Sequence, residues 1–189
     1  MAHNLHSSLK CELKIIKAKN LEFVPTGNLF VRYYLVDGKG SRIKLNTREV
    51  ASTCDPLWNE HICLECQGAT DTVGGLGDQR VVFELRWRSS APVIGRIVRS
   101  KLLGRAEMAW KDVLESMDLS IEKWVTLDIG HGAVVGLKPP ALRLGMKVGI
   151  VEEKGRVVGS SRWKECSCRH CAYGRDEEIF AIAAALTVI

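Results

Sequence analysis

Short stretches in which apolar and polar residues alternate recur along the first 150 residues, and they constrain the fold more than any other feature. They lie at residues 10–17, 29–36, 41–47, 59–66, 81–87, 102–108, 123–127 and 141–148, each bounded by glycine, proline, aspartate or serine. A period of two places alternate side chains on opposite faces of a strand. We therefore expect Leu13, Ile15 and Lys17 to share the buried face of the first strand. With a single helical turn near residues 110–115, eight such strands predict an all-β, antiparallel sandwich.

The chain of 189 residues suits one domain of about 150 residues with a tail. We predict a β-sandwich at residues 8–150, a linker at 151–162, and a cysteine-rich tail at 163–189 that contains a short apolar helix at 176–186. The glycine-rich segment 74–77 lacks the lysine and serine or threonine of a phosphate-binding loop, so we expect a flexible connector there.

Composition points to a reduced, cytoplasmic protein. No basic stretch followed by an apolar run opens the chain, and no segment has the roughly 20 apolar residues that span a bilayer. The seven cysteines are an odd number, which favours free thiols over a disulfide framework. The net charge of +5 is mild, so nucleic acid is not an expected partner.

Several motifs follow one another in a fixed order. They are Ala18-Lys19-Asn20-Leu21 after the first strand, then Pro56, Trp58 and Asn59, then Gly104, Trp124 and a closing alternation at 142–148. In this order, residues 10–150 resemble the C2 domain family of calcium- and lipid-binding β-sandwiches, and in particular its small single-domain members from plants. The resemblance implies an eight-stranded sandwich. The position of the motif-bearing strand at the start of the chain resembles the family's second (type II) topology.

Residues at the family's calcium positions argue against calcium. The family places aspartates in two loops, but here Glu22 is the only carboxylate of residues 21–30. Arg88 occupies the second position, and residues 86–105 hold six basic residues and no acidic one. Because calcium takes six to eight oxygen ligands, we expect no calcium cofactor.

Apolar and basic residues share the same two loops. The apolar residues are Phe23, Val24 and Pro25 in one loop and Pro92, Val93, Ile94 and Ile97 in the other, and the basic residues are Arg88, Arg96, Arg99 and Lys101. Loops of this kind insert apolar side chains between headgroups while cations meet anionic lipid. The alternative is that the apolar residues close the end of the sandwich and the arginines are solvated.

A second candidate lipid-binding surface lies on two neighbouring strands. Arg32, Tyr34, Lys44 and Arg48 are expected on one face, together with Asn46. C2 domains that recognise phosphoinositides carry lysines in these strands, and Arg32 and Arg48 match such positions. An ordinary charged sheet face is the alternative.

The tail contains Cys166, Cys168, His170 and Cys171. Thiolates and imidazole are zinc ligands, although the spacing is tighter than in paired C-x-x-C blocks. Reversible S-acylation, redox sensitivity and unmodified thiols remain alternatives.

No local catalytic signature is present, and Asp55, Glu60 and His61 fall in a turn and a strand, so we expect no enzyme activity. The sequence predicts a non-catalytic adaptor that binds anionic membrane lipids peripherally and without calcium, at the plasma membrane. The alternative is a protein-protein interaction module that uses the sandwich faces and the C-terminal helix.

Overall fold

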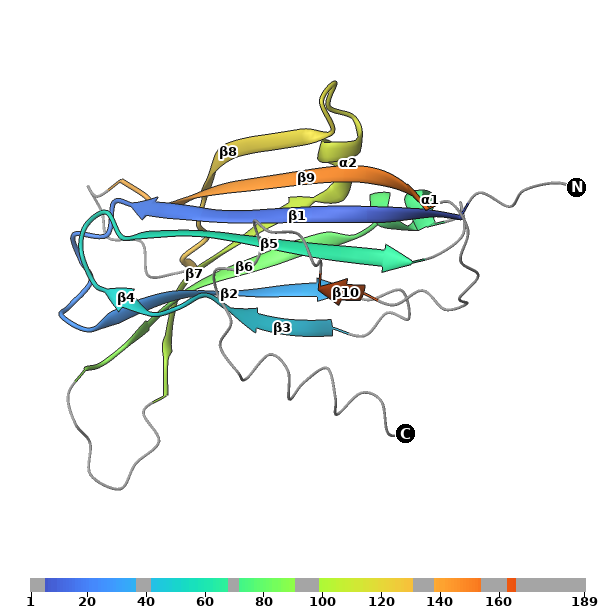
Figure 1. Ribbon diagram of the computed structural model, residues 1–189. Coiled ribbons are helices and arrows are strands. Elements are labelled where there is room, and N and C mark those ends of the chain that lie inside the picture. Colours follow the sequence, from blue (N-terminus) through green and yellow to red (C-terminus); the bar gives the residue numbers. More distant parts are fainter. Residues whose placement is uncertain are drawn as a thin grey trace, which may run out of the picture.

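The computed structural model consists of two antiparallel β-sheets packed face to face (Figure 1). It describes residues 6–36, 42–67, 72–90, 99–130, 138–153 and 163–165. The strands are β1 (His6–Lys19), β2 (Asn28–Val36), β3 (Arg42–Asn46), β4 (Val50–Ala51), β5 (Leu57–Gln67), β6 (Arg80–Arg88), β7 (Lys101–Ala109), β8 (Ser120–Thr126), β9 (Ala141–Glu153) and β10 (Trp163–Glu165). Two short helices, α1 (Thr72–Gly77) and α2 (Trp110–Leu114), lie at one end of the sandwich.

The strand order places β1 at the centre of the first sheet. That sheet has the order β10-β5-β1-β9-β8, and the second has the order β3-β2-β6-β7, with β4 also pairing with β2. The first strand of the chain therefore lies beside β9, the long strand that closes the domain. The predicted antiparallel sandwich is confirmed, and all eight predicted strands are present. The short strands β4 and β10 were not predicted.

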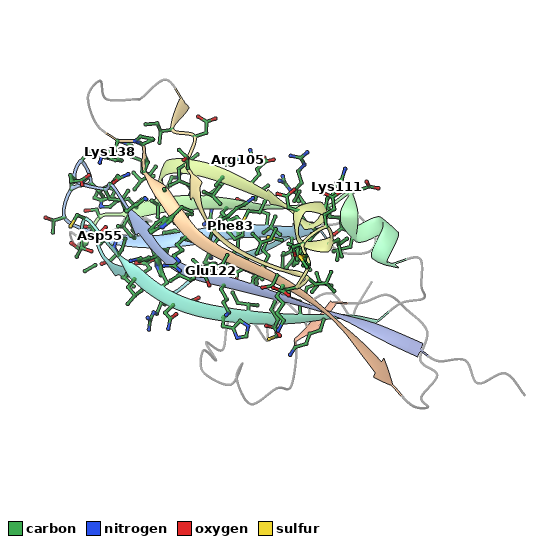
Figure 2. The ribbon with its side chains drawn as sticks, turned by 90° about the horizontal axis from the view of Figure 1, so that it is seen from above. Asp55, Phe83, Arg105, Lys111, Glu122 and Lys138 are labelled. Atoms are coloured by element: carbon green, nitrogen blue, oxygen red, sulfur yellow. The ribbon has the colours of Figure 1, made fainter. Side chains whose placement is uncertain are left out.

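Alternate residues of the facing strands form the core between the sheets. Leu13 and Ile15 of β1 are fully buried, as are Phe83 and Leu85 of β6. Figure 2 shows Phe83 in the middle of the molecule. Trp58, from the predicted proline, tryptophan and asparagine turn, is also fully buried. Burial of each large apolar side chain contributes about 1.5–3 kcal/mol, so this core is the main source of stability.

A β-bulge changes the alternation predicted for β1. The pairing of β1 with β9 shifts between Ile15 and Lys17, which leaves Ile16 as an extra residue relative to β9, and the pairing with β5 is irregular at the same point. An extra residue exchanges the two faces of a strand beyond it. Ala18 is therefore fully buried in place of Lys17. The prediction that Lys17 shares the face of Leu13 and Ile15 is wrong for this reason.

Two predicted connecting segments are ordered elements instead. Helix α1 takes the place of the flexible connector predicted at 74–77, and its Leu76 is buried in the core. Strand β9 continues to Glu153 because β1 begins at His6, which pairs with Glu153. The prediction that a linker starts at residue 151 is therefore wrong.

The beginning of the predicted tail is a strand. Trp163–Glu165 form β10, which pairs with Leu64, Glu65 and Cys66 at the edge of β5. The rest of the predicted linker and tail, including the helix at 176–186 and the candidate ligands Cys166, Cys168, His170 and Cys171, lies outside the described residues.

Candidate anion-binding surface

The outer face of the second sheet, which points away from the core, brings together several of the residues predicted to bind lipid. Val31, Tyr33 and Leu35 of β2 are buried, so the residues between them point outward. Arg32 lies opposite Asn46 of β3, and Tyr34 lies opposite Lys44. Opposite residues of an antiparallel pair share a face. The prediction that Arg32, Tyr34, Lys44 and Asn46 form one surface is confirmed.

Arg32, Arg42 and Lys44 form what we call the basic patch. The Nε of Arg32 donates a hydrogen bond of 3.0 Å to Oδ1 of Asn46, and the Arg42 guanidinium lies 5.1 Å from the centre of the Tyr34 ring. Lys44 is exposed. Within the described residues, none of the three cations forms an ion pair with a carboxylate. Among the described residues, the patch therefore carries three positive charges without an ion-pair partner.

Sequence reasoning missed Arg42. It alternates with Lys44 and Asn46 along β3, and that period of two is the signal that would have placed it on the same face. The predicted strand, residues 41–47, included Arg42, but the predicted surface followed the strand only from Lys44 toward Arg48. Extending the same period toward the start of the strand adds Arg42.

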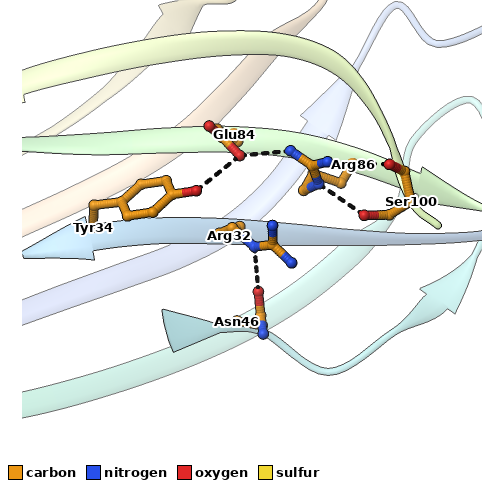
Figure 3. Close-up of polar contacts among 6 residues, drawn as sticks. All are labelled: Arg32, Tyr34, Asn46, Glu84, Arg86 and Ser100. Atoms are coloured by element: carbon orange, nitrogen blue, oxygen red, sulfur yellow. Dashed lines mark hydrogen bonds and ion pairs between the residues drawn. The ribbon is translucent and has the colours of Figure 1, made fainter. Parts of the chain in front are cut away.

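A carboxylate beside the basic patch is neutralised by other partners. Glu84 lies opposite Arg32 on the neighbouring strand β6. Its Oε2 is 2.7 Å from Nη1 of Arg86 and accepts a hydrogen bond of 3.3 Å from the hydroxyl of Tyr34. Arg86 also donates to Oγ and to the carbonyl oxygen of Ser100, at 2.9 and 3.1 Å. Figure 3 shows this network next to the Arg32–Asn46 bond. Glu84 thus pairs with Arg86 and forms no ion pair with Arg32.

Arg48 does not belong to this surface. Strand β3 ends at Asn46, and the next residue, Thr47, is buried, with its Oγ1 accepting a hydrogen bond from the amide of Val31. Arg48 then donates from Nη2 to the carbonyl oxygen of Trp58, at 2.6 Å, on β5 of the other sheet. The prediction that Arg48 continues the face of Lys44 is wrong, because the chain leaves the second sheet before reaching it.

Arg88 lies on the same outer face but is engaged by the protein itself. It forms an ion pair with Glu49, whose other carboxylate oxygen accepts a hydrogen bond from Asn28. Its guanidinium also lies 5.3 Å from the ring centre of Phe30, while that of Arg32 is 5.8 Å away. Phe30 is only 2% exposed although it points outward. Arg88 therefore covers an apolar ring and has its charge balanced by Glu49.

The predicted apolar loop residues are only partly available. Phe23 is 39% exposed, whereas Val24 is partly buried and packs against the core. Phe23 is therefore the more available of the two predicted apolar side chains. Pro92, Val93, Ile94, Arg96 and Ile97 lie outside the described residues. Arg99 and Lys101, at the beginning of β7, are exposed.

The residues considered for a hydrolytic site do not converge. Glu60 and His61 are neighbours on β5, and neighbouring residues of a strand point to opposite faces. Glu60 lies 3.9 Å from Nε of Arg48, while His61 contacts Glu12. Asp55 is exposed in the turn before β5.

Among the described residues, no helix has both the length and the apolar character needed to cross a bilayer.

Known proteins with the same fold are similar to this chain at low sequence identity. A structure of CC2D1B superposes with a TM-score of 0.58 at 16% identity, covering 78% of this chain and 60% of that one. The calcium-bound C2A and C2B domains of extended synaptotagmin 2 give 0.51 at 17% identity, covering 81% and 46%. The C2A domain of plant extended synaptotagmin 1 gives 0.50 at 15% identity, covering 76% and 96%. At identities this low, the structural similarity shows a shared fold and nothing more specific.

No curated protein matches the sequence closely enough to count as a relative. A family model, by contrast, matches residues 9–127 and describes a C2 domain. The matched region runs from β1 to the residue after β8, and thus includes the whole second sheet with the basic patch, and β1, β5 and β8 of the first sheet. Because the match covers more than half of the chain, this protein belongs to the C2 domain family.

Proposed function

We propose that this chain is a non-catalytic module that binds anionic phospholipid membranes without calcium, through the basic patch of Arg32, Arg42 and Lys44. C2 domains commonly bind lipids or membranes. The observation that carries the proposal is the patch itself, in which three cations on two adjacent strands have no carboxylate partner among the described residues. A basic residue near an anionic membrane surface contributes about 1 kcal/mol.

The end of the sandwich that would hold calcium supports a calcium-independent mode. Glu22 is the one carboxylate of the loop between β1 and β2, and it is exposed. Arg88 stands at the end of β6, and its partner Glu49 is already occupied by Arg88 and Asn28. Six to eight oxygen ligands are needed for calcium. With Glu49 engaged by Arg88 and Asn28, these described residues supply too few free carboxylate oxygens for calcium.

Co-sedimentation of the purified chain with liposomes tests the proposal. Neutral and anionic vesicles are compared, with calcium and with chelator. We expect binding to anionic vesicles under both conditions, and loss of binding in the triple variant Arg32→Gln, Arg42→Gln and Lys44→Gln. Three contacts of about 1 kcal/mol predict a loss on the order of 100-fold in affinity.

A charge-matched control separates the patch from overall charge. The variant Lys14→Gln, Lys111→Gln and Lys147→Gln removes three exposed cations that lie outside the second sheet. It has the same net charge as the patch variant and should bind nearly as wild type. Equal losses in both variants would mean diffuse electrostatic attraction instead of a defined surface. Absence of binding to every vesicle would favour a protein partner for the module.

A further inference from the structure

Three side chains with metal-binding atoms converge on the outer face of the first sheet, on the opposite side of the molecule from the basic patch. His61 and Cys63 are alternate residues of β5 and share one face, and Glu12 of β1 lies directly opposite Cys63. Nε2 of His61 is 3.3 Å from Oε2 of Glu12 and 3.8 Å from Sγ of Cys63. All three ligand atoms lie within 4.8 Å of one another.

The cluster does not have the geometry of a nucleophilic relay. In a thiol, imidazole and carboxylate relay, the nucleophile contacts one ring nitrogen and the acid contacts the other. Here Glu12 and Cys63 both approach Nε2 of His61. Cys63 is also only 1% exposed, which shields its sulfur from a substrate. Atoms gathered around a single point fit a bound ion better than a proton relay.

We propose that Glu12, His61 and Cys63 bind a divalent transition metal, with zinc as the best match. Zinc takes thiolate, imidazole and carboxylate ligands, and its ligand distances of about 2.0–2.3 Å imply ligand atoms roughly 3.3–3.6 Å apart in a tetrahedron. The two measured contacts of His61 are close to these spacings. On binding, the thiol of Cys63 releases its proton to solvent and the thiolate donates an electron pair to the metal. Three protein ligands leave one position of the tetrahedron for water, as in catalytic zinc sites.

The backbone holds these ligands in place. Glu12, His61 and Cys63 lie on β1 and β5, which pair continuously from Ser8 to Ile15 in the middle of the first sheet. Binding therefore needs side-chain adjustment and no rearrangement of the strands. Preorganised ligands lose less conformational entropy on binding than ligands carried by a loop.

A neighbouring cation tunes the site. Nζ of Lys10 is 3.1 Å from Oε1 of Glu12, the carboxylate oxygen that does not face His61. Oε2 thus remains directed at the cluster, but the ammonium group repels a dication. Lys10→Met keeps the aliphatic stem and removes the charge. This variant should bind zinc more tightly than the parent.

Metal titration of the full-length, reduced chain tests the site. To remove competition from the tail thiols, the parent carries Cys166→Ser, Cys168→Ser and Cys171→Ser. We expect one equivalent of zinc by calorimetry, and a thiolate-to-metal charge-transfer band when cobalt(II) is added. The affinity for zinc should fall by more than about tenfold in His61→Gln and in Glu12→Gln. Mutating a residue that only hydrogen-bonds to a metal ligand already lowers metal affinity about 10- to 100-fold, and these two variants remove a ligand itself. Cys54→Ser, which changes an exposed thiol outside the cluster, is the matched control.

Different results of the titration support or overturn the metal site. Loss of the charge-transfer band in Cys63→Ser, with binding retained in Cys54→Ser, supports the assignment. Unchanged stoichiometry and affinity in His61→Gln and Glu12→Gln overturn it, as does the absence of a band in the parent. If Cys63→Ser fails to fold, the other two variants decide, because their side chains are only partly buried. Membrane binding through the second sheet is a separate property, so either proposal survives the failure of the other.

Discussion

Phe83 shows how a single side chain stabilises the sandwich. It is fully buried, and its ring centre lies 6.3 Å from that of Tyr33, which extends from the neighbouring strand β2. We expect Phe83→Ala to lower the free energy of unfolding by about 3–5 kcal/mol, because it removes buried apolar surface and leaves a cavity. Chemical denaturation measures the change. Met117→Ala alters a fully exposed side chain and should leave the unfolding midpoint nearly unchanged. A similar loss of stability in both variants would contradict the role given to Phe83 in the core.

The side chain of Glu12 makes a pH-dependent contribution to the free energy of unfolding. Burial raises the pKa of its carboxyl, but the hydrogen bond and charge of Lys10 and the charge of His61 outweigh burial, so the pKa lies below its usual value of 4.5. A carboxyl with a lowered folded-state pKa stabilises the protein above the unfolded-state pKa, and the contribution is lost as the pH falls through the folded-state value. The stability advantage of wild type over Glu12→Gln should therefore be present above pH 4.5 and shrink below it.

The pH prediction is checked by urea unfolding of both proteins from neutral to acidic pH in metal-free buffer. A difference that does not change with pH would show that Glu12 keeps no lowered pKa in the folded state.

At the scale of elements, glycine sets the contact between β7 and the segment after β8. A Cβ atom added to Gly104 would lie 2.9 Å from Cβ of Leu127 and 3.1 Å from Cγ2 of Ile129. Two backbone hydrogen bonds hold these segments together: the amide of Asp128 donates to the carbonyl oxygen of Arg105 at 2.7 Å, and the amide of Arg105 donates to that of Asp128 at 2.8 Å. We expect Gly104→Ala to destabilise the fold by about 1–3 kcal/mol through overpacking.

Gly75 of α1 provides the contrast to Gly104. A Cβ atom there would meet no other atom within 4 Å, and alanine favours a helix over glycine by about 0.5–1 kcal/mol. Thermal melting should therefore move in opposite directions for Gly104→Ala and Gly75→Ala. Stabilisation by Gly104→Ala would show that the two segments separate easily.

At the scale of the whole molecule, the two sheets present different surfaces. The outer face of the second sheet carries the basic patch, whose three cations have no carboxylate partner among the described residues, while several charges elsewhere are paired, as in Lys123–Asp112 and Arg143–Glu122. Salt screens exposed charges over about 8–10 Å at physiological strength. Vesicle binding should therefore weaken steeply as salt rises, whereas thermal stability should change little because exposed ion pairs contribute at most about 1 kcal/mol each.

One salt series, read by co-sedimentation and by thermal melting, checks both parts of this expectation. Binding that persists at high salt would indicate an apolar docking mode, to which exposed Phe23 and Leu102 would be the natural contributors.

The alternation of residues along the chain was sufficient to predict the sandwich and all eight of its main strands. A strand with one buried face carries its own period, so local sequence reveals which residues enter the core. The same period placed Arg32, Tyr34 and Lys44 on one surface. Family resemblance was accurate at the level of fold, where Pro56, Trp58 and Gly104 occupy structural positions that a sandwich needs.

Features that depend on contacts between distant segments had to come from the tertiary structure. The bulge at Ile16 and the departure of Arg48 toward β5 depend on partner strands, so no local pattern reveals them. The approach of Glu12 to His61 and Cys63 joins residues about 50 positions apart. The sequence by itself determined the strands and their buried faces, because these follow from a local period. Only the tertiary structure decided which charges are paired and which ligands meet, because register and strand order bring those residues together.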